Sequence, residues 1–188
     1  MMKASKFLWA LFTLMVIVQL WVPANMIRTS ETAIANGQIF RFKTIPVDPN
    51  DPFRGKYIRL RYEVEQQRYP KAQLDNLEYN ETAYATIYES YGYANIEEIS
   101  SQKPTDWRPF VKVKVVSQTK DSVYARLPFD KFFMEESLAQ PAEDAVRSLQ
   151  SDSTSVVYAE VSVLNGNAVL QEVYINDEPI ADYVRARR

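Results

Sequence analysis

Four basic side chains lie close together along residues 54–61 and are the strongest candidates for chemistry in this sequence: Arg54, Lys56, Arg59 and Arg61. The planar guanidinium group matches oxyanions with two parallel hydrogen bonds, so this cluster suits a phosphate, a lipid headgroup or an acidic partner surface. A solvated strand face balanced by Glu63 and Glu65 has the same pattern, since exposed ion pairs contribute only roughly a few tenths of a kcal/mol. Both interpretations stay open at this point.

Other groups of polar side chains give weaker signals. Asp48, Asn50 and Asp51 carry calcium-type oxygens, but their spacing is too short for an EF-hand loop, and the interleaved prolines favour a simple turn. Ser117 or Ser122 with Lys120 could supply a Ser–Lys hydrolase dyad, although nothing selects either serine as a nucleophile. Adjacent acids such as those at 97–98, 135–136 and 143–144 do not by their adjacency place two carboxylates across a substrate.

The composition restricts the chemistry further, because the sequence contains no cysteine and no histidine. Disulfides, thiolate nucleophiles, imidazole bases and the usual zinc or haem ligands are therefore excluded. We predict no metal or cofactor site. Lys3 and Lys6 belong to the 22 basic residues, so the chain beyond them carries 20 basic against 24 acidic side chains. This balance argues against nucleic acid as a partner.

The basic cluster lies on a turn that opens into a strand. Two Asp-Pro pairs, at 48–49 and 51–52, prevent a helix from continuing, and Gly55 supplies the backbone freedom of a tight turn. From residue 56 the pattern alternates with period two and predicts a half-buried strand. The expected inner face carries Ile58, Leu60, Tyr62 and Val64, and the expected outer face carries Tyr57, Arg59, Arg61, Glu63 and Glu65.

Residues 55–62 resemble the signature of the GDYXXLXY protein family, which is named for this motif. Gly55, Tyr57, Leu60 and Tyr62 match it, and Lys56 stands where the family has Asp, which inverts the charge at the turn. Residues 127–136 are similar to a second common block of the family, an aromatic pair followed by acids. The resemblance implies a membrane-anchored protein and identifies Arg54, Gly55, Tyr57, Arg59, Leu60, Arg61 and Tyr62 as the residues of motif or binding interest. It implies no reaction.

The N-terminal segment has the character of a membrane helix. Residues 7–22 are uncharged, follow Lys3 and Lys6, end at Pro23, and carry Trp9 and Trp21 near their ends, as interfacial anchors do. A retained single-pass anchor and a cleaved signal peptide are the two main interpretations. In both, the positive flank stays in the cytoplasm and the rest of the chain is exported. Residues 25–37 are expected to form a polar stalk with a helical turn beginning at Ser30.

The rest of the chain reads as strands. Residues 39–45, 82–88, 110–116 and 123–127 have strand patterns, with a break at Tyr91 to Tyr93. Residues 156–164 and 168–175 flank Asn165-Gly166, which is the dipeptide preferred by a type I′ hairpin turn. Residues 141–150 are expected to form one short helix with Pro141 at its first position. Residues 66–81 are expected to form a connection.

These patterns predict a mostly β fold, an antiparallel sandwich or partly open barrel with one short helix, preceded by an N-terminal transmembrane helix. The expected organisation is an anchor or signal peptide at 1–24, a stalk at 25–37, an exported β domain at 38–183 and a solvated tail at 184–188. We interpret the chain as a non-enzymatic module that binds or supports another membrane protein. The alternatives are an anionic-ligand domain using Arg59 and Arg61 and a Ser–Lys or carboxylate hydrolase; the sequence names no small-molecule ligand.

Overall fold

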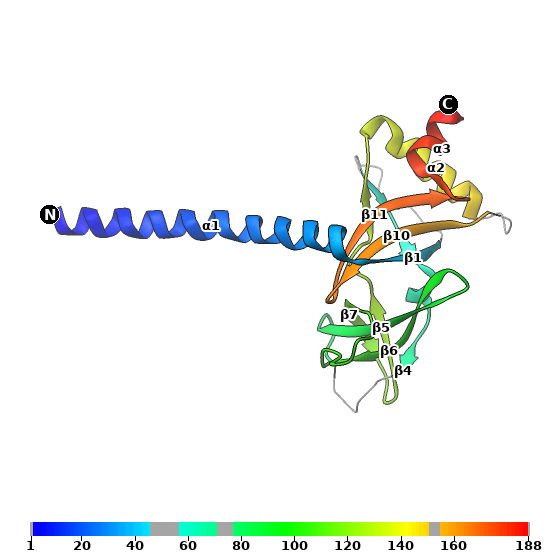
Figure 1. Cartoon of the computed structure of the whole chain (residues 1–188), viewed down its shortest axis with the longest axis horizontal. Coiled ribbons are helices and arrows are strands. Elements are labelled where there is room, and N and C mark those ends of the chain that lie inside the picture. Colours follow the sequence, from blue (N-terminus) through cyan, green and yellow to red (C-terminus); the bar gives the residue numbers. More distant parts are fainter. Residues whose placement is uncertain (1, 46–56, 71–76, 151–154, 188) are drawn as a thin grey trace.

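The structure is a computed structural model, and it describes residues 2–45, 57–70, 77–150 and 155–187. Figure 1 shows a long N-terminal helix that projects from a β domain lying across its C-terminal end. The Asp-Pro turn with Arg54, Gly55 and Lys56 lies outside the described residues, as does the segment 71–76. The expected mostly β fold is confirmed.

Helix α1 (Met2–Asn36) is longer than the sequence pattern indicated. It continues through Pro23, so residues 25–36 are helical, and Ser30 lies inside the helix and does not cap it. The uncharged stretch between Lys6 and Arg28 then contains 21 residues, which span roughly 30 Å as helix. This length matches the hydrocarbon thickness of a bilayer. By length and composition, the helix is able to cross a membrane.

The C-terminal end of α1 is docked onto the β domain. Ala33 is only 1% exposed, and the Ser162 hydroxyl donates a hydrogen bond of 2.6 Å to the Ala33 carbonyl oxygen. The Gly37 N–H donates to the same oxygen at 2.8 Å, and a Cβ at Gly37 would overlap both this oxygen and Ser162 Oγ. A side chain at position 37 would therefore push the helix off the sheet.

The β domain contains two five-stranded sheets that form a nearly closed barrel. The first has the order β12 (Glu178–Pro179), β11 (Asn167–Ile175), β10 (Val157–Leu164), β1 (Gln38–Ile45) and β3 (Arg61–Tyr62). The second has the order β4 (Tyr69–Pro70), β8 (Ser122–Arg126), β7 (Phe110–Gln118), β5 (Thr82–Ser90) and β6 (Tyr93–Ser100). A two-stranded ribbon joins β2 (Tyr57–Arg59) to β9 (Lys131–Phe133). All of the named strand pairs are antiparallel.

The hairpins differ in how well the sequence predicted them. Asn165 and Gly166 have φ of 51° and 82° and join β10 to β11, as the type I′ preference required. The expected break at Tyr91 to Tyr93 is found, since β5 ends at Ser90 and Tyr91 and Gly92 form a second tight turn, with φ of 51° and 80°. Strand β6, which follows this turn, was not predicted. Tyrosine rarely adopts this left-handed conformation, so its residue type does not indicate a tight hairpin turn at this break.

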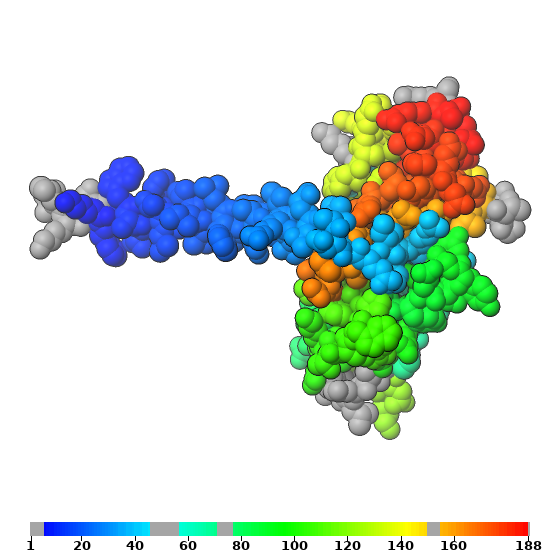
Figure 2. All heavy atoms as spheres, viewed as in Figure 1, coloured from blue at the N-terminus to red at the C-terminus, as the bar shows by residue number. Residues whose placement is uncertain are grey.

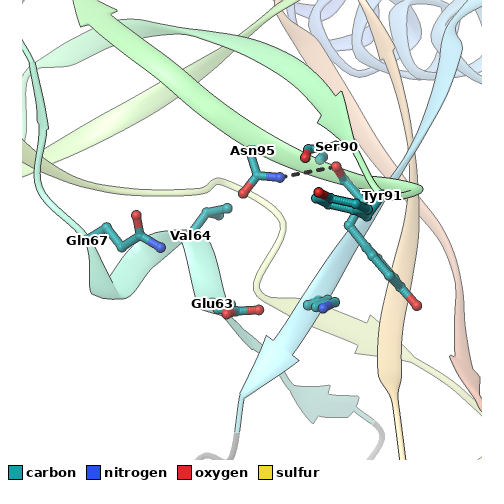
Figure 3. A pocket seen from close by; sticks show the side chains of 9 residues that line it. Glu63, Val64, Gln67, Ser90, Tyr91 and Asn95 are labelled. Carbon is teal, nitrogen blue, oxygen red and sulfur yellow. Dashed lines mark hydrogen bonds between the residues drawn. The ribbon is translucent and has the colours of Figure 1, made fainter.

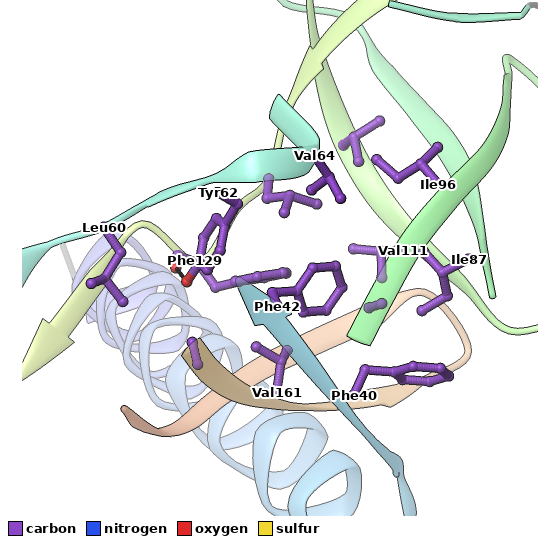
Figure 4. Close-up of a cluster of buried hydrophobic side chains, with 14 of the residues drawn as sticks. Phe40, Phe42, Leu60, Tyr62, Val64, Ile87, Ile96, Val111, Phe129 and Val161 are labelled. Atoms are coloured by element: carbon purple, nitrogen blue, oxygen red, sulfur yellow. Dashed lines mark hydrogen bonds between the residues drawn. The ribbon is translucent and has the colours of Figure 1, made fainter. Parts of the chain in front are cut away.

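The motif segment is a strand only in part. Its inner face is as predicted, since Ile58, Leu60, Tyr62 and Val64 are all buried. Figure 4 shows the last three of them in the core. The expected continuous strand is interrupted at Leu60, whose N–H donates to the Asp130 carbonyl oxygen at 2.8 Å. After β3 the chain turns into a 3₁₀ helix, η1 (Glu63–Gln66), and Glu65 is buried although the alternation placed it outside.

Helices α2 (Glu136–Gln150) and α3 (Ile180–Ala186) pack against each other at one end of the domain. Helix α2 begins five residues before the expected position, and Pro141 therefore lies inside it. Helix α3 includes part of the expected solvated tail, and Val184 is buried. The expected single short helix is thus replaced by two helices and the turn η1.

Replacing Leu60 with Ala tests the core position of the motif strand. Leu60 is 2% exposed, so we expect its truncation to lower the free energy of unfolding by about 2–5 kcal/mol through lost burial and a residual cavity. Urea unfolding of the full chain in detergent measures this. The matched control is Ile39→Ala on the exposed side of β1, for which we expect a change within about 0.5 kcal/mol. Equal effects of the two changes would contradict the assignment.

Candidate functional site

Tyr57 and Tyr62, the two motif tyrosines, have different surroundings. Tyr57 is partly exposed on β2, with its ring 5.6 Å from that of Phe133 and 5.4 Å from Lys131 Nζ. Tyr62 is fully buried, with its ring 5.9 Å from Phe42 and 5.1 Å from Phe129. The Tyr62 hydroxyl donates to the Phe129 carbonyl oxygen at 2.8 Å, a bond drawn in Figure 4. Desolvation raises the pKa of Tyr62 well above its usual value, so this phenol stays neutral and acts in the structure as a hydrogen-bond donor.

Arg59 and Arg61 lie on the exposed side of the same segment. Arg59 Nε is 3.5 Å from Asp130 Oδ2, which gives this guanidinium a carboxylate neighbour on the chain itself. Arg61 is exposed on β3, the edge strand of the first sheet. The outward orientation of both residues agrees with the alternation, and their role in binding stays a prediction.

Glu65 is a buried acid that the sequence pattern missed. It is 4% exposed, its Oε1 accepts the Leu127 N–H at 2.7 Å, and its Oε2 accepts the Tyr62 N–H at 3.2 Å. Burial raises the pKa of Glu65, while the two backbone hydrogen bonds and then Arg126 and Arg61 act in the opposite direction. Its position three residues after the cap of a helical turn is typical of an acid that reaches back to the cap N–H. The period-two strand pattern placed Glu65 on the outer face, so this capping pattern was not recognised in the sequence.

A cleft of about 230 Å³ opens where the two sheets meet. Figure 3 shows Glu63, Val64 and Gln67 of the η1 segment facing Ser90, Tyr91 and Asn95 of the β5–β6 hairpin. Lys43 of β1 lines the cleft as well. The sequence had assigned these residues to unrelated strands, a break and a connection, and only the tertiary fold brings them together.

The cleft combines charged, amide and aromatic groups. Lys43 Nζ lies 4.5 Å from the centre of the Tyr93 ring, and Asn95 Nδ2 donates to the Tyr93 carbonyl oxygen at 3.3 Å. Tyr91 at the hairpin tip is 99% exposed. A cleft with a cation, a carboxylate, two amides and a free tyrosine ring is able to hold main-chain and side-chain groups of a polar ligand.

An aromatic row continues the cleft wall over the outside of the first sheet. The Tyr93 ring is 5.9 Å from Tyr158, and Tyr158 stacks on Tyr174 at 5.2 Å. The Tyr158 hydroxyl donates to Asp177 Oδ1 at 2.7 Å, and Arg41 lies 5.3 Å from the Tyr158 ring. Desolvation is the main cause that raises the pKa of Tyr158. The row fixes Tyr93 in position, so this cleft wall is firmly supported.

The family model described as GDYXXLXY protein matches residues 19–173. The chain belongs to the GDYXXLXY family. The matched range includes the second half of α1, the motif segment, the cleft, the second sheet and the first sheet except β12 and the end of β11. No curated protein and no solved structure matches the chain.

Of the remaining candidates of the sequence, some lie outside the part of the chain that this GDYXXLXY-family structure describes. Asp48, Asn50 and Asp51 lie outside the described residues. Ser117 and Ser122 are on β7 and β8, and the Ser122 hydroxyl lies 2.6 Å from Thr119 Oγ1. Among the described residues, no group of three or more acids is placed to hold a metal ion.

The raised pKa of Glu65 has a consequence for stability. Between its usual pKa near 4.5 and its higher pKa in the folded state, the folded protein binds more protons at this site than the unfolded chain. The contribution of Glu65 to the free energy of unfolding therefore falls as the pH rises through that window.

Comparison of the natural chain with Glu65→Gln isolates this contribution. We expect the natural chain to lose stability relative to the variant as the pH rises from about 4.5, since glutamine does not ionise. Urea midpoints of both proteins across the pH range check this. Glu172, whose pKa is also raised by burial, is retained in both proteins and cancels. A constant difference between the two curves would show that the pKa of Glu65 is not raised by folding.

Proposed function

We propose that this GDYXXLXY-family protein is a single-pass membrane protein whose β domain lies outside the cytoplasm and binds another membrane protein. The positive flank at Lys3 and Lys6, the uncharged helix that follows it, and the tryptophans at positions 9 and 21 support this placement. A retained anchor is favoured over a cleaved signal because α1 continues without a break into the domain and is bonded to it.

The docking of α1 onto β10 is the single observation that carries the proposal. A flexible stalk would let the domain search a volume above the membrane, but a continuous helix closed by the Ser162 and Gly37 hydrogen bonds holds the domain at one height and orientation. A fixed height suits recognition of a neighbour that is itself fixed in the same membrane, because little orientational freedom remains to be lost on binding.

The cleft between the sheets is the proposed recognition surface. Among the described residues, β6 forms strand pairs with β5 alone, and its other side lies near β1 and β4. Side-chain pockets beside a strand select the side chains of an extended peptide. The cleft carries Lys43, Glu63 and Gln67 beside this strand. An extended peptide segment of the partner fits this combination.

The outer face with Arg59 and Arg61 is the alternative surface, for an anionic ligand or an acidic partner. Its support is the exposed position of Arg61 at the edge of the first sheet. Because Arg59 already lies near Asp130, we rank this surface below the cleft.

A reporter fused after Arg188 tests the membrane topology. We expect no signal from a reporter that is active only in the cytoplasm and a strong signal from one that is active only outside it, because positive residues precede the apolar helix. Activity assays of both fusions in intact cells give the answer. A bright cytoplasmic fusion would reverse the proposed orientation.

Photocrosslinking from position 91 tests the cleft. With benzoylphenylalanine in place of Tyr91, we expect a crosslink to another membrane protein in native membranes, since this ring is 99% exposed beside the cleft. The matched control places the same group at Tyr79, which is 81% exposed and outside the cleft lining. Crosslinks of equal yield at both positions would count against a specific surface.

Two variants then distinguish the cleft from the arginine face. Tyr91→Asn removes the ring, and asparagine tolerates the left-handed backbone, so we expect this variant to have normal stability. The partner identified by crosslinking should co-purify with it in an amount at least about tenfold lower than with the natural chain. Arg59→Gln with Arg61→Gln should leave recovery unchanged. The opposite result, with a salt-sensitive loss in the arginine variant alone, would favour the alternative surface.

A further inference from the structure

An exposed tryptophan lies on the loop between β6 and β7. Trp107 is 92% exposed, although a large apolar side chain on a solvated loop loses the benefit of burial. The loop beneath it is firmly held. Arg108 forms ion pairs with Asp106, with Glu97 at 2.9 Å and with Glu98 at 3.2 Å.

The loop also closes onto the neighbouring strand. The Ile87 N–H donates to the Pro109 carbonyl oxygen at 3.0 Å, immediately before β7 begins. The exposure of Trp107 is therefore a feature of an anchored loop.

Strand register places this loop at the end of the domain from which α1 projects. Gln38, which directly follows the α1 junction, pairs with Val163 near the end of β10, so the β10–β11 turn lies at the α1 end. Gly166 in that turn lies against the Phe110 ring, and its carbonyl oxygen accepts the Lys112 N–H at 3.1 Å. The 101–109 loop leads directly into Phe110. Tyr91 lies at the opposite end of the domain, in the cleft beside Lys43.

The α1 end of the domain lies close to the membrane surface. The docked Ala33 lies only five positions after Arg28, the first charge after the uncharged stretch, which is about 8 Å along a helix. Figure 2 shows the orange β10–β11 hairpin tip and the green surface next to it forming the edge of the domain on the side of α1. This edge therefore lies at the level of the lipid headgroups when α1 spans the bilayer.

The surroundings of Trp107 suit that position. Lys103 Nζ lies 5.7 Å from the Phe110 ring, and Lys112 Nζ donates to Asn167 Oδ1 at 3.1 Å beside the hairpin tip. The three acids of the loop region, Glu97, Glu98 and Asp106, are engaged by Arg108. Tryptophan favours the membrane–water interface, and lysines near it are attracted to anionic headgroups.

We propose that Trp107 inserts into the interfacial layer of the same membrane that α1 crosses, with Lys103 and Lys112 facing anionic lipid headgroups. The loop is then a second attachment point that stops the domain from pivoting about the α1 junction. This inference rests on the proposed single-pass placement.

Fluorescence of the full chain in nanodiscs of phosphatidylcholine and phosphatidylglycerol tests the proposal. The sequence has three tryptophans, so the variant Trp9→Phe with Trp21→Phe leaves Trp107 as the sole emitter. A lipid carrying a nitroxide next to its headgroup should quench this emission about twofold or more, as an interfacial ring requires. In the matched control, Trp107→Phe and Tyr91→Trp are added to the same variant, and its emission should not be quenched because position 91 lies at the other end of the domain.

A third protein, which keeps only Trp21, reports on the anchor itself. If a nitroxide in the acyl chains quenches Trp21 and the headgroup nitroxide leaves Trp107 unaffected, α1 is inserted and the lipid contact of the loop is disproved. If Trp21 is not quenched, the single-pass placement fails, and the inference fails with it. Shielding of Trp107 from aqueous iodide in native membranes but not in nanodiscs would instead identify a protein partner and overturn the proposal.

Discussion

Three buried hydrogen bonds between the motif segment and residues 127–130 hold the two sheets together. The Tyr62 hydroxyl bonds the Phe129 carbonyl oxygen, Glu65 accepts the Leu127 N–H, and the Leu60 N–H donates to the Asp130 carbonyl oxygen. β3 belongs to the first sheet, and Leu127 directly follows β8 of the second. Irregular backbone inside a core needs such partners, because an unpaired buried polar group costs roughly 1–3 kcal/mol. The conformation of this connection, and with it the barrel, depends on them.

This constraint gives the motif a physical meaning. Leu60 fills the core, and Tyr62 fills it and donates the critical hydrogen bond; phenylalanine in its place would leave the Phe129 carbonyl oxygen unpaired. Arg59 and Arg61, which the sequence indicated as candidate anion-binding residues, point outward from the same short segment. The part of the motif that the structure describes is thus organised around folding, and the cleft that carries the proposed function is built from other residues.

Features that depend on local sequence were predicted, and features that depend on tertiary contacts were not. Strict alternation placed β1, β7 and the inner face of the motif strand, and Asn165-Gly166 fixed a hairpin, because these features are local. Strand β6 was missed because Tyr91 adopts a left-handed conformation that its residue type disfavours. Glu65 was misplaced because its partner Leu127 is 62 residues away. The cleft depends entirely on tertiary contacts, so no local sequence pattern predicted it.

Pro23 shows how the surroundings decide the meaning of a residue. In a soluble helix an interior proline costs about 3 kcal/mol, which favoured ending the span there. Proline is tolerated in helices that cross a bilayer, because neighbouring groups satisfy the freed backbone there, and α1 continues through Pro23. The continuation lengthens the uncharged stretch to the thickness of a bilayer and lets Ala33 reach the sheet in the same helix.

That continuity links the two proposals made for this protein. The α1 junction and the Trp107 loop lie at one end of the domain, and the Tyr91 cleft lies at the other. The Ser162 and Gly37 hydrogen bonds alone oppose tilt at the α1 junction, whereas a second contact at the headgroup level adds resistance to that tilt. Because the cleft is distant from the α1 junction, a small tilt of the domain at this junction displaces the cleft more than it displaces residues close to the junction. In the proposed arrangement, the membrane contact of the loop therefore contributes to recognition by keeping the cleft at a constant height for its partner.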